Sequence, residues 1–203
     1  EMLAARPALY DASGEGHYNL ISALHKAIRG SDPDAALYWF ARMIQGGEDP
    51  LFLARRLIRM ANEDIGLADS QAIQQAIAAR DAYQMLGSPE GELSLAQCVV
   101  YLALAPKSNA VYTAFNQAMI TAEGEGHLPP PKHILNAPTK MMKNLDYGKY
   151  YVYDHDTPDA FSGQHYFPTD MRHKFYAPVP RGFEREMQKR LTYFDKLREK
   201  LKK

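Results

Sequence analysis

The adjacent carboxylates Glu63 and Asp64 are the first residues whose chemistry is worth weighing, because paired acids can serve as general acid and base. Neighbouring side chains on a helix point about 100° apart, which suits two groups acting on one substrate poorly. The alternative is charge pairing with arginines of a neighbouring helix, for which the nearest candidates are Arg55, Arg56 and Arg59. We interpret the two acids as members of such ion pairs.

Histidine and cysteine are the other residue types that could support catalysis or bind a metal. His155 lies between two aspartates, but no second histidine or cysteine follows at ligand spacing, which favours a solvated acidic turn. Cys98, the single cysteine, lies in an apolar segment, where a buried thiol is expected rather than a nucleophile. A single cysteine also excludes an internal disulfide and favours a reducing compartment.

Two further patterns concern anions. Lys107-Ser108-Asn109 opens a predicted helix and could bind an anion there, although simple capping by Ser108 or Asn109 is the favoured interpretation. Basic and aromatic residues also interleave in the C-terminal half, where they could stack on and neutralise single-stranded nucleic acid, or pack for structure. The candidate contact residues for nucleic acid or another partner are Lys107, Lys140, Lys143, Lys149, Arg172, Lys174 and Arg181.

Charge is unevenly distributed, although the 203 residues balance 24 basic against 24 acidic side chains. Residues 1–100 carry eight basic and 13 acidic side chains, and residues 101–203 carry 16 and 11. Opposite charge in the two halves fits either an anionic partner or a neighbouring copy. Phosphate-binding glycine loops are absent from the sequence, as are a membrane-spanning apolar run and a signal peptide. We therefore predict no catalytic residue and no metal site in this chain.

Helical periodicity accounts for most of the chain, so that the predicted fold class is all-α. Proline follows an acid or serine at Asp32-Pro33, Asp49-Pro50 and Ser88-Pro89, which is a helix-start signal. The predicted helices span residues 17–29, 33–45, 50–65, 70–86, 88–104 and 109–123. The fifth is apolar nearly all round, which favours the centre of a bundle or a subunit interface. Its candidate interface residues are Leu95, Val99, Tyr101 and Leu102.

Residues 124–180 change in character and are rich in tyrosine, proline, aspartate and histidine. So many aromatic residues argue against a disordered linker, so we predict an ordered, extended arm containing a short helix over residues 138–145. A final, highly charged helix over residues 182–200 carries one apolar stripe. Residues 1–16 are expected to be a linker or the end of a preceding module, and the chain part of a longer protein.

Motifs along almost the whole chain resemble the C-terminal region of the replication-associated recombination AAA+ ATPases. This family is called RarA or MgsA in bacteria and Werner-helicase-interacting protein in animals. The matching stretches are HYNLISALHK (17–26), RGSDPDAALYW (29–39), GEDP (47–50), ARRL (54–57), EDIGLA (63–68), GSPEGE (87–92), APKSNAVY (105–112), NAPTK (136–140) and RGFE (181–184). The resemblance is weakest over residues 154–180.

The resemblance implies a multi-helix collar like that of clamp loaders, with residues 1–16 ending the ATPase lid and residues 17–203 forming the oligomerisation domain. It implies a homotetramer, with ATP and magnesium bound by an AAA+ module that these residues do not include. It also implies a cytoplasmic, nucleoid-associated parent that acts on DNA at forks and single-strand/duplex junctions and associates with single-stranded-DNA-binding protein. The expected function is tetramerisation, the alternative is a single-stranded or junction DNA-binding module, and a stand-alone enzyme is not expected.

Overall fold

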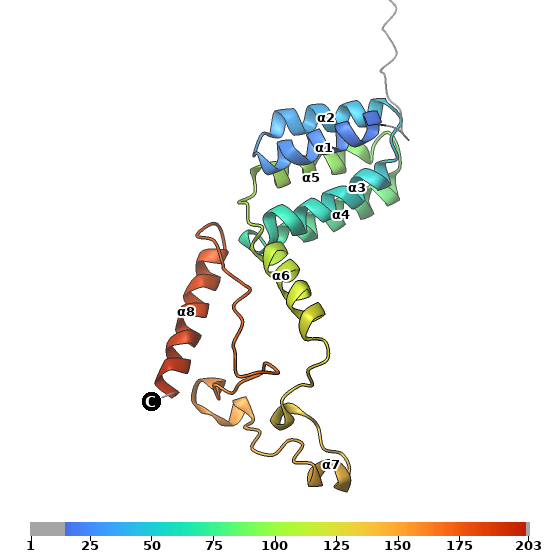
Figure 1. Cartoon of the computed structure of the whole chain (residues 1–203). Coiled ribbons are helices and arrows are strands. Elements are labelled where there is room, and N and C mark those ends of the chain that lie inside the picture. Colours follow the sequence, from blue (N-terminus) through green and yellow to red (C-terminus); the bar gives the residue numbers. More distant parts are fainter. Residues whose placement is uncertain (1–14, 202–203) are drawn as a thin grey trace, which may run out of the picture. The chain divides into compact units, whose positions relative to one another are not determined.

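The computed structural model describes residues 15–201 of the 203-residue chain (Figure 1). All regular elements in this range are helical, which confirms the all-α prediction. The predicted linker over residues 1–16 lies almost wholly outside the described range. Two compact units are present: the first runs to Tyr112 and includes Pro178–Arg185, and the second comprises Thr113–Ala177 and the residues from Glu186 onward. Within residues 15–201, no helix combines the length and apolar character that a membrane span requires.

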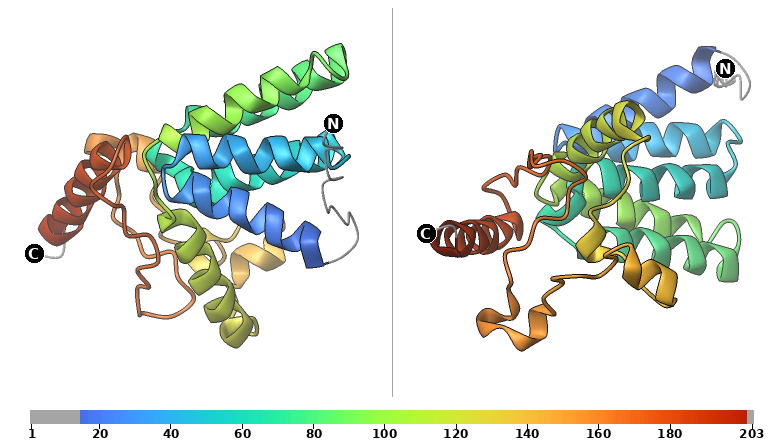
Figure 2. Two further views of the ribbon diagram at one scale, coloured as in Figure 1. Left: turned by 90° about the horizontal axis from the view of Figure 1, so that it is seen from above. Right: turned by 60° about the horizontal axis from the view of Figure 1, so that its bottom comes forward.

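The first unit is a bundle of five helices that lie side by side (Figures 1 and 2). They are α1 (Glu15–Arg29), α2 (Pro33–Gln45), α3 (Pro50–Met60), α4 (Gln71–Leu86) and α5 (Glu92–Leu104). Two of the three predicted start signals are confirmed, because Asp32 accepts a hydrogen bond from the amide of Ala35 and Asp49 accepts from that of Leu51.

The start predicted at Ser88-Pro89 is wrong. Residues 88–91 form a turn, in which the amide of Gly91 donates to the carbonyl of Gly87, and α5 begins only at Glu92. The peptide bond between Ser88 and Pro89 is cis. The serine hydroxyl contacts Tyr83 Oη at 3.1 Å instead of capping a helix, so this proline belongs to a turn.

Helix α5 lies at the centre of the bundle and packs against α1, α2, α3 and α4. Leu95, Val99 and Leu102 are completely buried in the core of the single chain. Tyr101 is half-buried and donates its hydroxyl to Asp69 at 2.6 Å. Enclosure by four helices accounts for the apolar character of α5, so the prediction of a subunit interface at these four residues loses its support.

An irregular segment follows the end of α3. One π-helical turn spans Ala61–Ile65, and a 3₁₀ turn, Gly66–Ala68, follows. Gly66 adopts a φ of +50°, which a residue with a side chain rarely tolerates. Such π-turns often occur at functional sites, and this one carries both Glu63 and Asp64.

Residues 178–185 return to the first unit and dock beside that irregular segment. The amide of Phe183 donates to the carbonyl of Ala68 at 2.8 Å, and Arg181 Nε donates to the carbonyl of Lys107 at 2.7 Å. Glu184 is completely buried, and its carboxylate accepts hydrogen bonds from Ser108 Oγ and from the amide of Val179, both at 2.8 Å. Hydrogen bonds to a buried carboxylate offset the cost of removing it from water.

The second unit has few regular elements. Helix α6 (Ala110–Glu125) enters it from the first unit, and α8 (Glu184–Leu201) ends it. Between them lie α7 (Lys140–Asn144) and three 3₁₀ turns, joined by extended chain. Thr139 is the N-cap of α7, because its hydroxyl accepts a hydrogen bond from the amide of Met142 at 3.2 Å. The predicted short helix is therefore present but two residues later.

Replacing Gly182 by alanine should destabilise the first unit. Gly182 has a φ of +52°, and a Cβ there would lie 2.1 Å from the carbonyl oxygen of Ala68. We expect the Gly182→Ala chain to lose at least about 2 kcal/mol of unfolding free energy, measured by urea denaturation. Gly124→Ala is the control, because a Cβ at this position in α6 meets no neighbouring atom. Equal stability of the two variants would contradict the docking geometry.

Candidate polar cleft and exposed apolar surface

A polar cleft of about 390 Å³ lies in the first unit. It is formed by the end of α1, the π-turn, the loop before α6 and the returning segment 178–185. Its lining residues are Arg29, Glu63, Asp64, Lys107, Ser108, Asn109, Tyr112 and Arg181. Four of the sequence motifs quoted above therefore meet at one place, although up to about 150 residues separate them along the chain.

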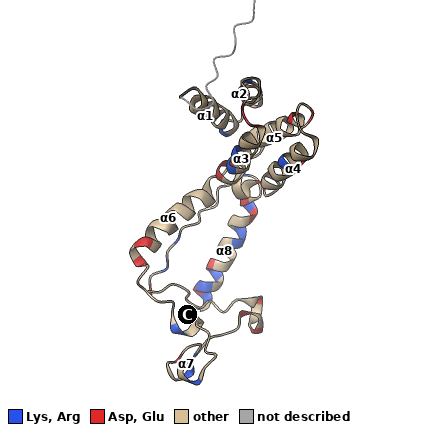
Figure 3. Ribbon diagram, turned by 90° about the vertical axis from the view of Figure 1, so that its right-hand side faces the viewer, with Lys and Arg blue, Asp and Glu red and all other residues tan. Residues whose placement is uncertain are grey.

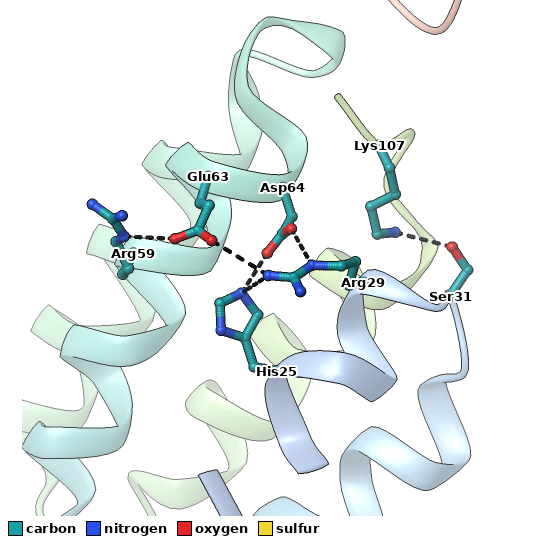
Figure 4. A network of polar contacts seen from close by, with 7 residues as sticks. All are labelled: His25, Arg29, Ser31, Arg59, Glu63, Asp64 and Lys107. Carbon is teal, nitrogen blue, oxygen red and sulfur yellow. Dashed lines mark hydrogen bonds and ion pairs between the residues drawn. The ribbon is translucent and has the colours of Figure 1, made fainter. Parts of the chain in front are cut away.

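Asp64 is the buried centre of this cleft (Figure 4). Arg29 Nε donates to Asp64 Oδ1 at 2.6 Å, and His25 Nε2 lies 2.5 Å from Oδ2. The histidine nitrogen must carry a proton to bond a carboxylate, so the approach of Arg29 Nη2 to the same nitrogen at 3.1 Å is not a hydrogen bond. The main chain takes part too, since the Asp64 carbonyl accepts from the amide of Ser108 at 2.7 Å.

Glu63 lies beside Asp64 and bonds two arginines. Arg59 Nε donates to it at 2.8 Å, and Arg29 Nη2 approaches at 3.3 Å (Figure 4). The predicted ion pairing is confirmed for Arg59, whereas Arg55 pairs with Asp49 at 3.7 Å. The main partners of Asp64 come from α1, about 35 residues earlier, and no local spacing signals such a contact.

The electrostatics of this network favour a charged carboxylate. Burial by itself raises the pKa of Asp64, but the hydrogen bonds from His25 and Arg29 outweigh it, so the pKa lies below its usual value. The bond to Asp64 likewise raises the pKa of Arg29. Ligand atoms of His25, Glu63 and Asp64 lie within 4.8 Å of one another, as a metal site requires. The Arg29 guanidinium already bonds both carboxylates there, so a divalent cation would have to displace it.

Lys107 and Ser108 hold the loop before α6. Lys107 Nζ donates to Ser31 Oγ and to the carbonyls of Ala103 and Ala105, which uses all three of its protons. Desolvation lowers the pKa of this lysine. Ser108 Oγ accepts from the amide of Ala110 at 3.2 Å, so the capping interpretation is confirmed. Lys107 is thus engaged in the fold rather than directed toward a ligand.

The seven predicted contact residues are divided between the units. Lys107 and Arg181 line the cleft of the first unit, and the other five belong to the second. Lys140, Lys143 and Lys174 are exposed, whereas Lys149 pairs with Asp146 at 2.9 Å. The side chain of Arg172 lies over the ring of Phe167, 6.0 Å from its centre. The seven therefore do not belong to a single unit.

The excess positive charge of the C-terminal half does not lie on the aromatic arm, residues 124–180, where nucleic-acid binding was considered. Residues 101–184 carry eight basic and eight acidic side chains, and residues 185–203 carry eight and three. The whole excess therefore belongs to the final segment, and the ribbon of α8 is blue at several places where Lys and Arg occur (Figure 3). The aromatic arm is electrically neutral, which weakens any salt-dependent attraction to nucleic acid.

Exposed apolar side chains gather in the second unit. Of the 24 large apolar residues that are exposed among the described residues, 14 belong to this unit. In contrast, Ala114 is the only buried apolar residue that the unit contributes to the described core. Compact domains of this size bury most of their apolar surface, so this unit does not complete a core within the single chain.

A family model and several known proteins match most of the length of this chain, and they indicate the same family. The family model described as MgsA AAA+ ATPase C terminal matches residues 30–195. Replication-associated recombination protein A of Coxiella burnetii is 51% identical over 195 residues, which cover 95% of this chain and 44% of the relative. The Escherichia coli K12 protein of the same name is 49% identical with the same coverage. ATPase WRNIP1 of Dictyostelium discoideum is 42% identical over 94% of this chain and 21% of its own length. The chain thus spans less than half of these relatives.

Removing the charge of Asp64 should weaken the first unit in a pH-dependent way. The folded-state pKa lies below the ordinary value of 3.8, so its contribution to stability is present above that value and is lost as the pH falls through the folded-state pKa. We expect Asp64→Asn to lower the unfolding free energy by about 2 kcal/mol at pH 7, and by less in acid. Urea denaturation at both pH values measures this.

Asp81→Asn is the matched control, because Asp81 is exposed and pairs with its neighbour Arg80. We expect it to change stability by less than about 0.5 kcal/mol at either pH. Equal losses for both variants, or a loss for Asp64→Asn that does not depend on pH, would contradict the role given to the buried carboxylate.

Proposed function

Because this chain belongs to the family of MgsA-type AAA+ ATPase C-terminal regions, we propose that it is the self-association module of an ATPase of replication-associated recombination. Four copies assemble through it, as the family resemblance implies. The relatives are more than twice as long, and the proposal assigns ATP and magnesium binding to the remainder of such a protein. It also assigns to the whole cytoplasmic assembly the contacts with DNA at forks and junctions and with single-stranded-DNA-binding protein.

The observation that carries this proposal is the second unit without a core of its own. Among its described residues, the second unit exposes 14 large apolar side chains, whereas its one buried apolar residue is an alanine. Much apolar surface therefore remains in contact with water. Burial of such surface stabilises association by about 25 cal/mol per Å². A further copy of the chain can supply the missing contacts, because a closed symmetric assembly uses the same surfaces on every subunit.

The polar cleft has a structural role in this proposal. Its hydrogen bonds fix Lys107 and Ser108, where the chain leaves the first unit toward α6, and Arg181 to Glu184, where it returns. Both ends of the intervening segment are therefore anchored on the rigid bundle. Anchoring reduces the conformational entropy that this segment loses when it assembles.

The first test is the solution mass of the chain, measured by light scattering over a concentration series. We expect four times the 22.9 kDa of a single chain, at low and at high salt, because apolar contacts do not depend on ionic screening. A helical, cooperatively unfolding monomer at tens of micromolar would overturn the proposal. A mass that falls with added salt would instead assign assembly to the opposite charges of the two halves.

Binding of single-stranded nucleic acid is the second candidate function. One observation favours it: the rings of His173 and Phe175 stack at 5.3 Å, with Phe167 beside them under the guanidinium of Arg172. Aromatic rings and cations of this kind bind unpaired bases and phosphates in many proteins. The neutral charge of the arm counts against it, so we place this function second.

A combined Lys140→Ala, Lys149→Ala and Arg172→Ala variant tests the second candidate. If the arm binds nucleic acid, the variant should bind a fluorescent single-stranded oligonucleotide at least about tenfold more weakly, with a shallower salt dependence. Lys189→Ala with Lys196→Ala on α8 is the comparison. Weakening by the α8 pair alone would move the contact to the final helix, and no binding by the parent chain at low salt would remove this function.

A further inference from the structure

We propose that a second copy of this chain docks on one face of α6, which we call the α6 face and define as Phe115, Met119 and Ile120. The inference rests on the proposed self-association and names the surface that performs it. No motif predicted this surface, because sequence analysis assigned the role to α5. All three residues lie in the part of α6 that belongs to the second unit.

The composition of α6 does not suit a helix that remains in water. No charged side chain occurs between Ala110 and Ala122, and the first is Glu123. Surface helices normally carry charges on the side away from the core, and a helix without them is normally buried. Figure 3 shows how α6 differs from α8 in this respect: α6 is tan, and so uncharged, for most of its length, whereas blue and red residues recur along α8.

The uncharged side chains of α6 are nevertheless exposed. Phe115 is 62% exposed, Met119 56% and Ile120 72%. Phe115 and Met119 are four residues apart and share one side of the helix, and Ile120 widens this surface. The covered residues, Ala114, Ala118 and Thr121, lie on the other side. The α6 face is therefore a large apolar surface that its own unit leaves uncovered.

The chemistry of the α6 face selects its occupant. It offers no cation to a phosphate and no hydrogen-bond donor to a base edge, so it lacks the groups that give nucleic-acid binding its affinity and sequence readout. A matching surface must be apolar and free of charge, and the same face of a second copy meets both conditions. Two such faces related by a two-fold axis form an isologous contact, in which each residue meets its own symmetry-related counterpart or near neighbours.

The α6 face must be the centre of a larger contact. A stable interface buries about 800 Å² on each partner, which is more than three side chains provide. Other exposed apolar residues of the second unit can supply the remainder. Binding energy concentrates in large side chains near the middle of an interface, which makes these three the positions where substitution should matter most.

Charge substitution on the α6 face tests the inference in the full chain. Phe115→Glu with Met119→Glu should weaken self-association at least about tenfold by light scattering, because each glutamate would be buried against apolar side chains. Gln117→Glu is the matched control, because Gln117 is exposed on the same helix but points away from Met119. Circular dichroism should show the same helix content for all three chains.

Cysteine cross-linking provides a second test that does not depend on disrupting the fold. Cys98 is buried and is the only natural cysteine, so a Cys98→Ala background leaves one engineered thiol. Met119→Cys should form disulfide-linked dimers under mild oxidation, because such bonds need Cα atoms within about 7 Å. Gln117→Cys should not.

The two proposals fail in different ways. A parent chain that assembles while the double glutamate variant assembles equally well, and Met119→Cys does not cross-link, would overturn the α6 face and leave self-association in place. A monomeric parent chain would overturn both. If the double glutamate variant misfolds, selective cross-linking at Met119 over Gln117 decides the matter alone.

Discussion

The buried carboxylate of Asp64 is the constraint on which the first unit depends. A charge removed from water must be matched, and here the match comes from His25 and Arg29 at the end of α1. The main-chain carbonyl of the same residue accepts from Ser108, which begins the passage to α6. Ser108 in turn donates to buried Glu184 on the returning segment. Directly and through Ser108, one acidic residue therefore links three chain segments that are far apart in sequence, and its carboxylate is already paired with cationic and polar groups of the protein itself.

The two apolar helices α5 and α6 show why composition and environment must be considered together. Both have long stretches without charge, but four helices enclose α5, whereas Phe115, Met119 and Ile120 of α6 remain in water. The first unit is complete as a core, and the second is not. The uncovered apolar surface of the second unit is what the proposed self-association would remove from water.

The excess of basic residues in the C-terminal half had suggested nucleic-acid binding. The C-terminal half is basic as a whole, but its excess lies beyond Glu184, and the aromatic arm between α6 and α8 is neutral. Several of its cations also have partners, such as Asp146 for Lys149 and the ring of Phe167 for Arg172. The excess positive charge of the C-terminal half therefore belongs to α8 and the residues after it rather than to the arm.

The sequence by itself determined the all-α class, the bounds of α2 and α4, the caps at Asp32 and Asp49, and the family. These depend on short-range periodicity and capping, which neighbouring residues encode. Only the tertiary structure decided that α5 is core, that Arg29 and His25 meet Asp64, and that α6 is the apolar helix left exposed. Those outcomes depend on which distant segments cover which side chains. An apolar helix has the same sequence pattern whether its own chain or another copy removes it from water, so periodicity alone could not separate the two.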